Sequence, residues 1–386
     1  MSTSPFRGRR GRILLTSLTI GAAAIAMAMA SATSTAGQSA PTRGAAFTSG
    51  TAAGNLKGDR ELLLSLLAYR KQHPKAKKNW RIAYIMVGLA DGYLQNQRKQ
   101  ALKLAKQYGV TLQVFNGAFN PSAQAKAIQD ALSLKFDGYI VEPVSGTGLC
   151  STIKKQFFAR KLPVVVFNNP ICGDYGYTKG EIGFVGFQDQ DFETSQPVTA
   201  YRTCVAKYKN CIAAHIVGPP AFELVNRFEK GVKIASAKYP QVKLVFSQPA
   251  DFDPAKAYVV AQDAIRANPD INLWVSMDDK MSGSIVRALR LAGKDPKDSI
   301  IFSEACDGVG TDLVKRGLIT ASKCGLSTEE AQMPIEIMVK YLETGKTSPG
   351  YVNVGRDHPI ITGKNGIGNN GFLMEQNANR WTPQYP

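Results

Sequence analysis

Residues 81–87 read Arg-Ile-Ala-Tyr-Ile-Met-Val, and this short apolar run opens the pattern that decides the fold. Similar runs recur along the chain, and a stretch of helical length separates most of them from the next. They cover residues 110–115, 138–142, 163–167, 182–186, 211–217, 242–247, 273–276 and 300–302. Strands that are buried on both faces of a sheet have such continuous apolar runs, and helical crossovers join parallel neighbours. The pattern therefore predicts an α/β protein built on parallel sheets.

The alternation passes through two similar rounds, which meet near residues 186–190. A chain of 386 residues is long enough for two separate hydrophobic cores. We therefore expect two doubly wound lobes. In open sheets of this kind the ligand binds outside the carboxyl ends of the strands, so functional residues are expected just after each apolar run.

The first 30 residues have a different character. Four arginines lie at positions 7, 9, 10 and 12, and the uncharged residues 13–30 end in Ala-Met-Ala. A basic head, an apolar middle and a small-x-small exit predict a secretory signal peptide that is cleaved near Ala30. A membrane anchor is the alternative, because 18 uncharged residues approach spanning length, but many of them are Ala, Thr or Ser.

The pair Arg9-Arg10 leaves the Sec and twin-arginine export routes both open. The first cysteine of the chain is Cys150, so attachment through an acylated N-terminal cysteine is not expected. We therefore expect a free periplasmic protein.

The formal net charge of +17 raises the question of a nucleic-acid partner. The basic residues are scattered along predicted helices, and no basic run is interleaved with aromatic residues. The densest basic cluster, residues 75–78, falls in a predicted linker. A nucleic-acid partner is therefore not expected.

Six cysteines, an even number in a chain predicted to be exported, favour disulfides. Six cysteines allow about fifteen pairings, and sequence alone does not choose among them. A metal site is the rival interpretation, but the sequence has no C-x-x-C pair. The three histidines, His73, His215 and His358, stand in no complete ligand spacing with a cysteine. We therefore expect neither a metal nor a cofactor.

Standard catalytic and nucleotide-binding signatures are absent from the sequence. The loop after the first apolar run, residues 88–92, reads Gly-Leu-Ala-Asp-Gly and is not a G-x-G-x-x-G motif. Residues 345–347, Gly-Lys-Thr, lack the earlier glycine of a P-loop, and no G-x-S-x-G elbow occurs. These observations favour a binding protein over an enzyme.

Polar and aromatic residues follow nearly every apolar run. They are Asp91, Tyr93, Asn116, Glu142, Asn168, Asn169, Gln188, Asp189, Phe222, Asn226, Arg227, Phe252, Asp278, Asp279 and Asp307. Carboxylates and amides can hydrogen-bond many hydroxyl groups, and aromatic faces suit the apolar face of a sugar ring. Each aspartate or asparagine taken alone could equally cap the helix that follows it. The combination favours a cleft for a small polar ligand such as a sugar or polyol.

Residues 247–256, Ser-Gln-Pro-Ala-Asp-Phe-Asp-Pro-Ala-Lys, carry a resemblance to a known family. Together with residues 277–281 (Met-Asp-Asp-Lys-Met) and 305–308 (Ala-Cys-Asp-Gly), they resemble the periplasmic sugar-binding proteins related to ribose-binding protein. The segment 82–94 is similar to the first strand and ligand loop of that family, and the likeness extends in order from about Arg81 to Lys346. The resemblance implies two lobes, joined by three chain crossings, that close on a ligand like a clamshell.

The implied division of the chain has four parts. Residues 1–30 are the signal peptide, and residues 31–79 are a flexible leader with one helix, at 57–73, that Pro74 ends. The N-terminal lobe takes residues 80–187 and 326–353, and the C-terminal lobe takes residues 188–325 and 354–386. This topology also favours three disulfides between sequence neighbours: Cys150–Cys172, Cys204–Cys211 and Cys306–Cys324.

Carried over by position, the ligand contacts of the family fall on twelve residues. They are Asp91, Tyr93, Leu94, Glu142, Asn168, Asn169, Phe222, Asn226, Arg227, Phe252, Asp278 and Asp307.

Several of these positions depart from the family pattern. Leu94 replaces one of two stacking aromatics, Asn168-Asn169 replaces the usual Asp-Arg pair, and Gly325 or its neighbour replaces a glutamine. Four acidic candidates face one arginine, so a polyol, an unusual sugar or a cationic ligand would fit.

The function implied by the resemblance is solute capture for an ABC permease in the inner membrane, by a monomeric protein whose cleft closes on a sugar or polyol. A receptor partner for chemotaxis or for a sensor kinase, and a binder of another small polar or cationic solute, are the alternatives. A transcriptional regulator of the same architecture would need a DNA-binding helix-turn-helix ahead of the first lobe, where this chain has its export signal.

Overall fold

The computed structural model describes residues 56–364 and 366–386. The predicted signal peptide and most of the predicted leader lie outside these residues. Within them, no helix combines the length and the apolar character that crossing a membrane requires. The helix predicted at 57–73 is present as α1 (Leu56–Gln72), and it packs on β11 and α10 of the first lobe.

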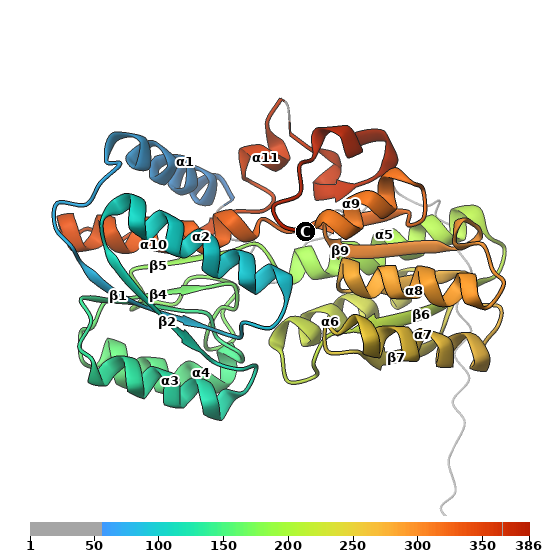
Figure 1. Ribbon diagram of the computed structural model, residues 1–386, viewed down its shortest axis with the longest axis horizontal. Helices are drawn as coiled ribbons and strands as arrows, with labels where there is room; N and C mark the ends of the chain where they lie inside the picture. The colour runs from blue at the N-terminus through green and yellow to red at the C-terminus, as the bar shows by residue number, and fades with distance from the viewer. Residues whose placement is uncertain (1–55, 365) are drawn as a thin grey trace, which may run out of the picture. The chain divides into compact units, whose positions relative to one another are not determined.

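The first lobe is built on a six-stranded sheet in the order β11-β5-β4-β3-β1-β2, in which all neighbours are parallel. Its strands are β1 (Arg81–Met86), β2 (Thr111–Asn116), β3 (Gly138–Val141), β4 (Val164–Phe167), β5 (Gly183–Gly186) and β11 (Tyr351–Asn353). Its helices are α2 (Gly92–Tyr108), α3 (Pro121–Ser133), α4 (Gly146–Ile153) and α10 (Ser327–Thr344). Helices α2 and α10 pack side by side, and α3 packs against α4 (Figure 1).

The second lobe repeats the plan with the order β12-β10-β9-β8-β6-β7. Its strands are β6 (Cys211–Val217), β7 (Val242–Pro249), β8 (Leu273–Ser276), β9 (Ile300–Ala305), β10 (Ala321–Cys324) and β12 (Phe372–Leu373). Its helices are α5 (Gln190–Lys207), α6 (Glu223–Lys238), α7 (Pro254–Ala267), α8 (Asp279–Leu291), α9 (Gly308–Lys315) and the short α11 (Pro359–Thr362). The prediction of two doubly wound lobes is confirmed, with one antiparallel strand, β12, added at an edge.

The chain passes between the two sheets three times, after β5, after β10 and after β11. The apolar runs of the sequence become the buried strands, and every residue of β3, β4, β5, β8 and β9 is buried. The edge strands β2 and β7 keep many exposed residues. Because all strands but β12 run parallel within each sheet, the loops that follow their carboxyl ends gather on one edge of each lobe.

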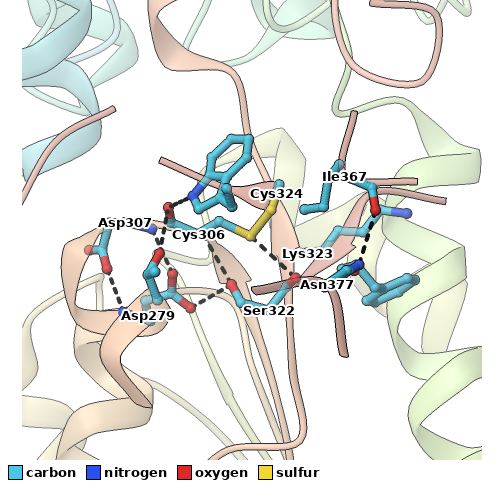
Figure 2. Close-up of a disulfide and its surroundings, with 12 residues drawn as sticks. Asp279, Cys306, Asp307, Ser322, Lys323, Cys324, Ile367 and Asn377 are labelled. Atoms are coloured by element: carbon cyan, nitrogen blue, oxygen red, sulfur yellow. Dashed lines mark hydrogen bonds between the residues drawn. A yellow bond between two sulfur atoms is a disulfide. The ribbon is translucent and has the colours of Figure 1, made fainter. Parts of the chain in front are cut away.

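All six cysteines form disulfides, in the three pairs that the topology favours: Cys150–Cys172, Cys204–Cys211 and Cys306–Cys324. Figure 2 shows the third pair, which links the loop after β9 to the end of β10. Its surroundings are held by buried hydrogen bonds, because the Ser322 hydroxyl accepts from the Cys306 amide and donates to a carboxylate oxygen of Asp279 (Figure 2). The pair therefore fixes the backbone at the carboxyl ends of two neighbouring strands.

Candidate ligand-binding cleft

A cleft lies where the carboxyl ends of the two sheets meet, and it encloses about 580 Å³ of space, part of it open to solvent. It is lined by Val87, Asp91, Tyr93, Leu94, Phe119, Glu142, Asn168, Gln188, Phe222, Leu224, Phe252, Met277, Asp278, Glu304, Ala305, Gly325 and Tyr385. Most of these residues follow or end a strand. The strand order reverses beside β1 in the first sheet and beside β6 in the second, which is where a ligand is expected in this architecture.

The structure brings eight of the twelve predicted site residues together in this lining. They are Asp91, Tyr93, Leu94, Glu142, Asn168, Phe222, Phe252 and Asp278. The other four predicted residues, Asn169, Asn226, Arg227 and Asp307, do not line the cleft.

Asn169 and Arg227 form a bridge between the lobes behind the cleft. The guanidinium of Arg227, on α6, donates to Oδ1 of Asn169, which follows β4. Asn226 is exposed, because one residue turns the helix by about 100° and carries this side chain away from the face that holds Arg227. Asp307 is fully buried, and its Oδ1 accepts from the Gly310 amide 2.8 Å away as the N-cap of α9.

Asp91 and Asp278 are both helix caps and lining residues of the cleft. Oδ1 of Asp91 accepts from the Leu94 amide at 2.9 Å at the start of α2, and Oδ1 of Asp278 accepts from the Met281 amide at 2.9 Å at the start of α8. Capping the following helix and lining the cleft are therefore compatible for these two strand-end aspartates. Each cap uses one carboxylate oxygen, and capping fixes the carboxylate at the edge of the cleft.

A buried carboxylate on α10 organises the first-lobe wall. Oε2 of Glu330 accepts three hydrogen bonds, from the Tyr93 hydroxyl at 2.7 Å, from Nε2 of Gln97 at 2.9 Å and from Nδ2 of Asn168 at 3.0 Å. Glu330 itself does not line the cleft. It holds two side chains that do, Tyr93 and Asn168.

A relay of amides joins the two lobes across the floor of the cleft. Nδ2 of Asn168 donates to Oε1 of Gln188 at 2.8 Å, and Nε2 of Gln188 donates to Oε1 of Glu304 at 3.1 Å. Asn168 follows β4 of the first sheet, whereas Glu304 lies in β9 of the second. Gln188 stands on the chain crossing between them.

The aromatic part of the lining comes from both lobes. Phe222 makes edge contacts with Phe119, at 5.8 Å between ring centroids, and with Phe252, at 6.3 Å. Two glycines make room for these rings, since a Cβ at Gly88 would lie 2.6 Å from the Phe119 ring and a Cβ at Gly218 would lie 2.3 Å from the Phe252 ring. The rings offer an apolar surface against which the C–H groups of a ligand can pack.

The cleft carries several acidic groups, and burial raises their pKa values so that they keep their protons to higher pH. Burial raises the pKa of Glu142 well above its usual range and raises the pKa of Asp91. Burial also raises the pKa of Asp278 to about 7 and that of Glu304 to about 8. Without a ligand, part of this cleft is therefore protonated near neutral pH.

Three side-chain donors of the lining, on Tyr93, Asn168 and Gln188, are already used within the protein. The Tyr93 hydroxyl donates to Glu330, Nδ2 of Asn168 to Gln188 and Glu330, and Nε2 of Gln188 to Glu304. Other polar atoms of the lining remain unpaired: Oδ1 of Asn168, Oε2 of Glu304 and the hydroxyl of Tyr385 are buried and have no hydrogen-bond partner within residues 56–364 and 366–386. The Asn168 oxygen is an acceptor, whereas the raised pKa of Glu304 keeps a donor proton on its carboxyl group near neutral pH. A ligand that fits this wall must therefore both donate and accept hydrogen bonds, and hydroxyl groups do both.

No group of three or more His, Cys, Asp or Glu side chains in the described part of the chain is arranged to hold a metal ion.

Four lining residues of importance were not predicted: Phe119, Glu304, Gly325 as a wall residue, and Tyr385. Phe119 follows β2 and could have been found by the strand-end rule, which selected Asn116 instead; that residue is exposed. Ala118 and Phe119 both have a left-handed backbone, with φ of 51°, and this turn brings the ring to the cleft. Tyr385 lies 60 residues beyond Gly325, after every apolar run, so no pattern pointed to it.

Comparison with known proteins places this geometry in a family. The family model described as "periplasmic binding protein domain" matches residues 82–347. The ribose import binding protein of Salmonella typhimurium is 23% identical over 270 residues, which are 70% of this chain and 87% of the relative.

Two solved structures have the same fold. A solute-binding protein of an ABC transporter from Actinobacillus succinogenes, with bound D-allose, has a TM-score of 0.63 and 20% identity, and the match covers 79% of this chain and all (100%) of that one. The Caulobacter myo-inositol binding protein has a TM-score of 0.63 and 18% identity, over 72% of this chain and 93% of that one. With its family match across both sheets and its cleft between them, the chain belongs to the periplasmic binding protein family.

Proposed function

We propose that this protein is the exported solute-binding component of an ABC importer and that it captures a sugar or polyol in the cleft between its lobes. The observation that carries the proposal is the set of unpaired polar atoms in the cleft. Asn168 and Glu304 present buried, unpaired oxygens from opposite lobes. Asp91, Glu142 and Asp278 add carboxylates to the same space.

The relatives support the same class of ligand. The curated relative from Salmonella is named for ribose import, and the two structural relatives were solved with D-allose and with myo-inositol. All three compounds are small, neutral and rich in hydroxyl groups. A ligand of this kind can hydrogen-bond the unpaired polar atoms of the cleft, as donor or as acceptor, without bringing a charge into it.

Capture requires that both lobes contact the ligand at once. The aromatic surface and the acceptors come from both sheets, so they surround a ligand only when the lobes are together. Direct contacts also favour this arrangement, since the Glu223 carboxylate on α6 accepts from the backbone amides of Gly146 and Thr147 at the start of α4, at 2.6 and 3.2 Å. Ligand binding would shift an open–closed equilibrium toward the closed form, which a permease could then recognise.

We also propose which residues contact the ligand, where the two lobes divide and where in the cell the protein acts. The proposed contacts are the eight predicted residues that line the cleft, with Phe119, Gln188, Glu304 and Tyr385 added. The lobes divide at residues 187/188, 325/326 and 353/354, which fall at the three crossings between the sheets. A monomeric periplasmic protein, released by cleavage near Ala30, would perform this task.

The test is to identify the bound compound. Protein purified without denaturation should release a small polyhydroxylated compound when it is denatured, and mass spectrometry would detect it. Stripped and refolded protein should then bind that compound in calorimetry with 1:1 stoichiometry. The dissociation constant should be about 1 μM, which corresponds to a binding free energy of roughly −8 kcal/mol. Release and rebinding of a polyamine or another cation instead of a sugar or polyol would overturn the proposal.

A further inference from the structure

The segment 381–386 reaches the cleft from outside both sheets. Its first anchor is on the second lobe, where the indole Nε1 of Trp381 donates to the Cys306 carbonyl oxygen at 2.7 Å. A second anchor on the same lobe is the Tyr385 carbonyl oxygen, which accepts from the Gly308 amide at 2.9 Å. Figure 1 marks the end of the chain beside α9.

The same segment also contacts the first lobe. Oε1 of Gln384 accepts from the Thr328 amide at 2.9 Å, and Nε2 of Gln384 donates to Oε2 of Glu329 at 2.6 Å. Both partners lie in the first turn of α10, which packs on the first sheet. Segment 381–386 therefore spans the two lobes, and Tyr385 lies at the point of crossing.

The ring of Tyr385 forms a wall of the cleft. It packs edge-on against Tyr93, with 5.9 Å between centroids and 88° between ring planes. A Cβ at Gly92 would lie 3.4 Å from the same ring, which is van der Waals contact, so the ring lies close to the start of α2. Tyr385 also lines a neighbouring open depression with Lys280 and Lys99, so its ring separates the cleft from the outer surface.

The hydroxyl of Tyr385 is buried and unpartnered. The residue is 8% exposed, and its hydroxyl has no hydrogen-bond partner within the described residues. Burial and the nearby carboxyls of Asp307 and Asp278 raise the pKa of this phenol well above its usual value, so it keeps its proton. A buried hydroxyl that lacks a partner destabilises the protein, and a hydrogen bond to a ligand oxygen would remove this cost.

The residues beside Tyr93 supply a second observation about the Tyr385 ring. Leu94 stands where the resemblance places one of two stacking aromatics, and it lines the cleft beside Tyr93. Gly325 makes room for the Tyr93 ring at the same wall, since a Cβ at this position would lie 3.2 Å from that ring. Tyr385 supplies a second aromatic surface next to Tyr93, from a different part of the chain.

We propose that Tyr385 is a ligand-contacting residue that determines specificity: its hydroxyl hydrogen-bonds the bound sugar or polyol and its ring closes the cleft over it. This assignment rests on the proposed function, because it names a further contact of the same cleft. Segment 381–386 then acts as a strap that brings Tyr385 into place when both lobes are together.

The test uses Tyr385→Phe and Tyr385→Ala in the full chain, with Tyr108→Phe as the matched control. Tyr108 also has a buried hydroxyl without a partner in the described residues, but it lies at the far end of α2 and does not line the cleft. The probes are D-ribose, D-allose and myo-inositol, titrated into ligand-stripped protein by calorimetry. The probe that binds wild type most tightly is then used for the variants.

We expect Tyr385→Phe to weaken binding of that probe about tenfold and Tyr385→Ala by thirtyfold or more. Tyr108→Phe should leave the affinity unchanged, and neither Phe variant should lower the melting temperature of the stripped protein. Affinity of both Tyr385 variants within twofold of wild type would overturn the assignment and leave the proposed function intact. If wild type binds none of the three probes, the proposed function fails, and the assignment of Tyr385 fails with it.

Discussion

Glu330 offers a quantitative test of the buried polar network behind the cleft. Its carboxylate holds Tyr93 and Asn168 in place, and burial raises its pKa from 4.5 to about 7, against the opposing effect of three hydrogen bonds. In the unfolded chain this proton is lost near pH 4.5. The stability that the protonated form contributes is therefore complete below about pH 4.5 and declines as the pH rises to about 7.

The size of the effect follows from the difference between the two pKa values. At about 1.36 kcal/mol per pH unit, the charge costs the folded state roughly 3 kcal/mol at high pH, and roughly 2 to 3 kcal/mol of this appears between pH 5 and 8. Glu330→Gln removes the charge but keeps an oxygen that can accept from Tyr93. The variant should therefore gain roughly 2 to 3 kcal/mol relative to wild type over that pH range.

The assay is urea unfolding of ligand-stripped protein at pH 5 and pH 8, followed by tryptophan fluorescence. Glu229→Gln, at an exposed position on α6, changes the net charge by the same amount and serves as the control. The free energy of unfolding of Glu330→Gln minus that of wild type should increase with pH, whereas the control difference should stay flat. A flat difference for Glu330→Gln would refute the reasoning that a proton is held on this buried group.

Two further predictions concern the cleft and its closure. Asp91→Asn keeps an oxygen to cap α2 but removes a carboxylate from the lining. Sugar affinity measured by calorimetry should therefore fall at least tenfold, while the melting temperature changes by less than about 2 °C. Unchanged affinity would show that Asp91 is not part of the binding site. Glu223→Ala deletes two hydrogen bonds between the lobes, so the radius of gyration of the stripped protein in small-angle X-ray scattering should increase and the affinity should fall about fivefold. A scattering curve identical to that of wild type would show that this contact does not hold the lobes together.

The sequence predicts the architecture well because buried parallel strands have a direct signature. β6 spans Cys211–Val217, the same residues as its apolar run, and β1 and β4 differ from their runs by one residue. The strands β11 and β12 have three and two residues, which is too short for any pattern to stand out. The family also bears out the expectation of a binding protein rather than an enzyme.

The candidate site is predictable only where strand ends supply it. The residues Asp91, Glu142 and Asp278 follow apolar runs, and the strand-end rule finds them. Glu330 lies in a helix and contacts the site through residues more than 150 positions away in the sequence. The sequence alone does not distinguish it from any other glutamate in a helix. Tyr385 lies in a segment that has neither a helical nor a strand periodicity. The path of this segment depends on tertiary hydrogen bonds, so the sequence does not predict it.

The central claim is that the cleft recognises the hydroxyl groups of a ligand through polar atoms that the protein leaves unpaired. The most direct measurement is calorimetric titration of wild type with the tightest-binding sugar and with its series of single deoxy analogues. Loss of one donor should weaken binding about tenfold or more for at least two analogues, because a buried acceptor then stays unpaired. Equal affinity for the parent sugar and every deoxy analogue would contradict the account.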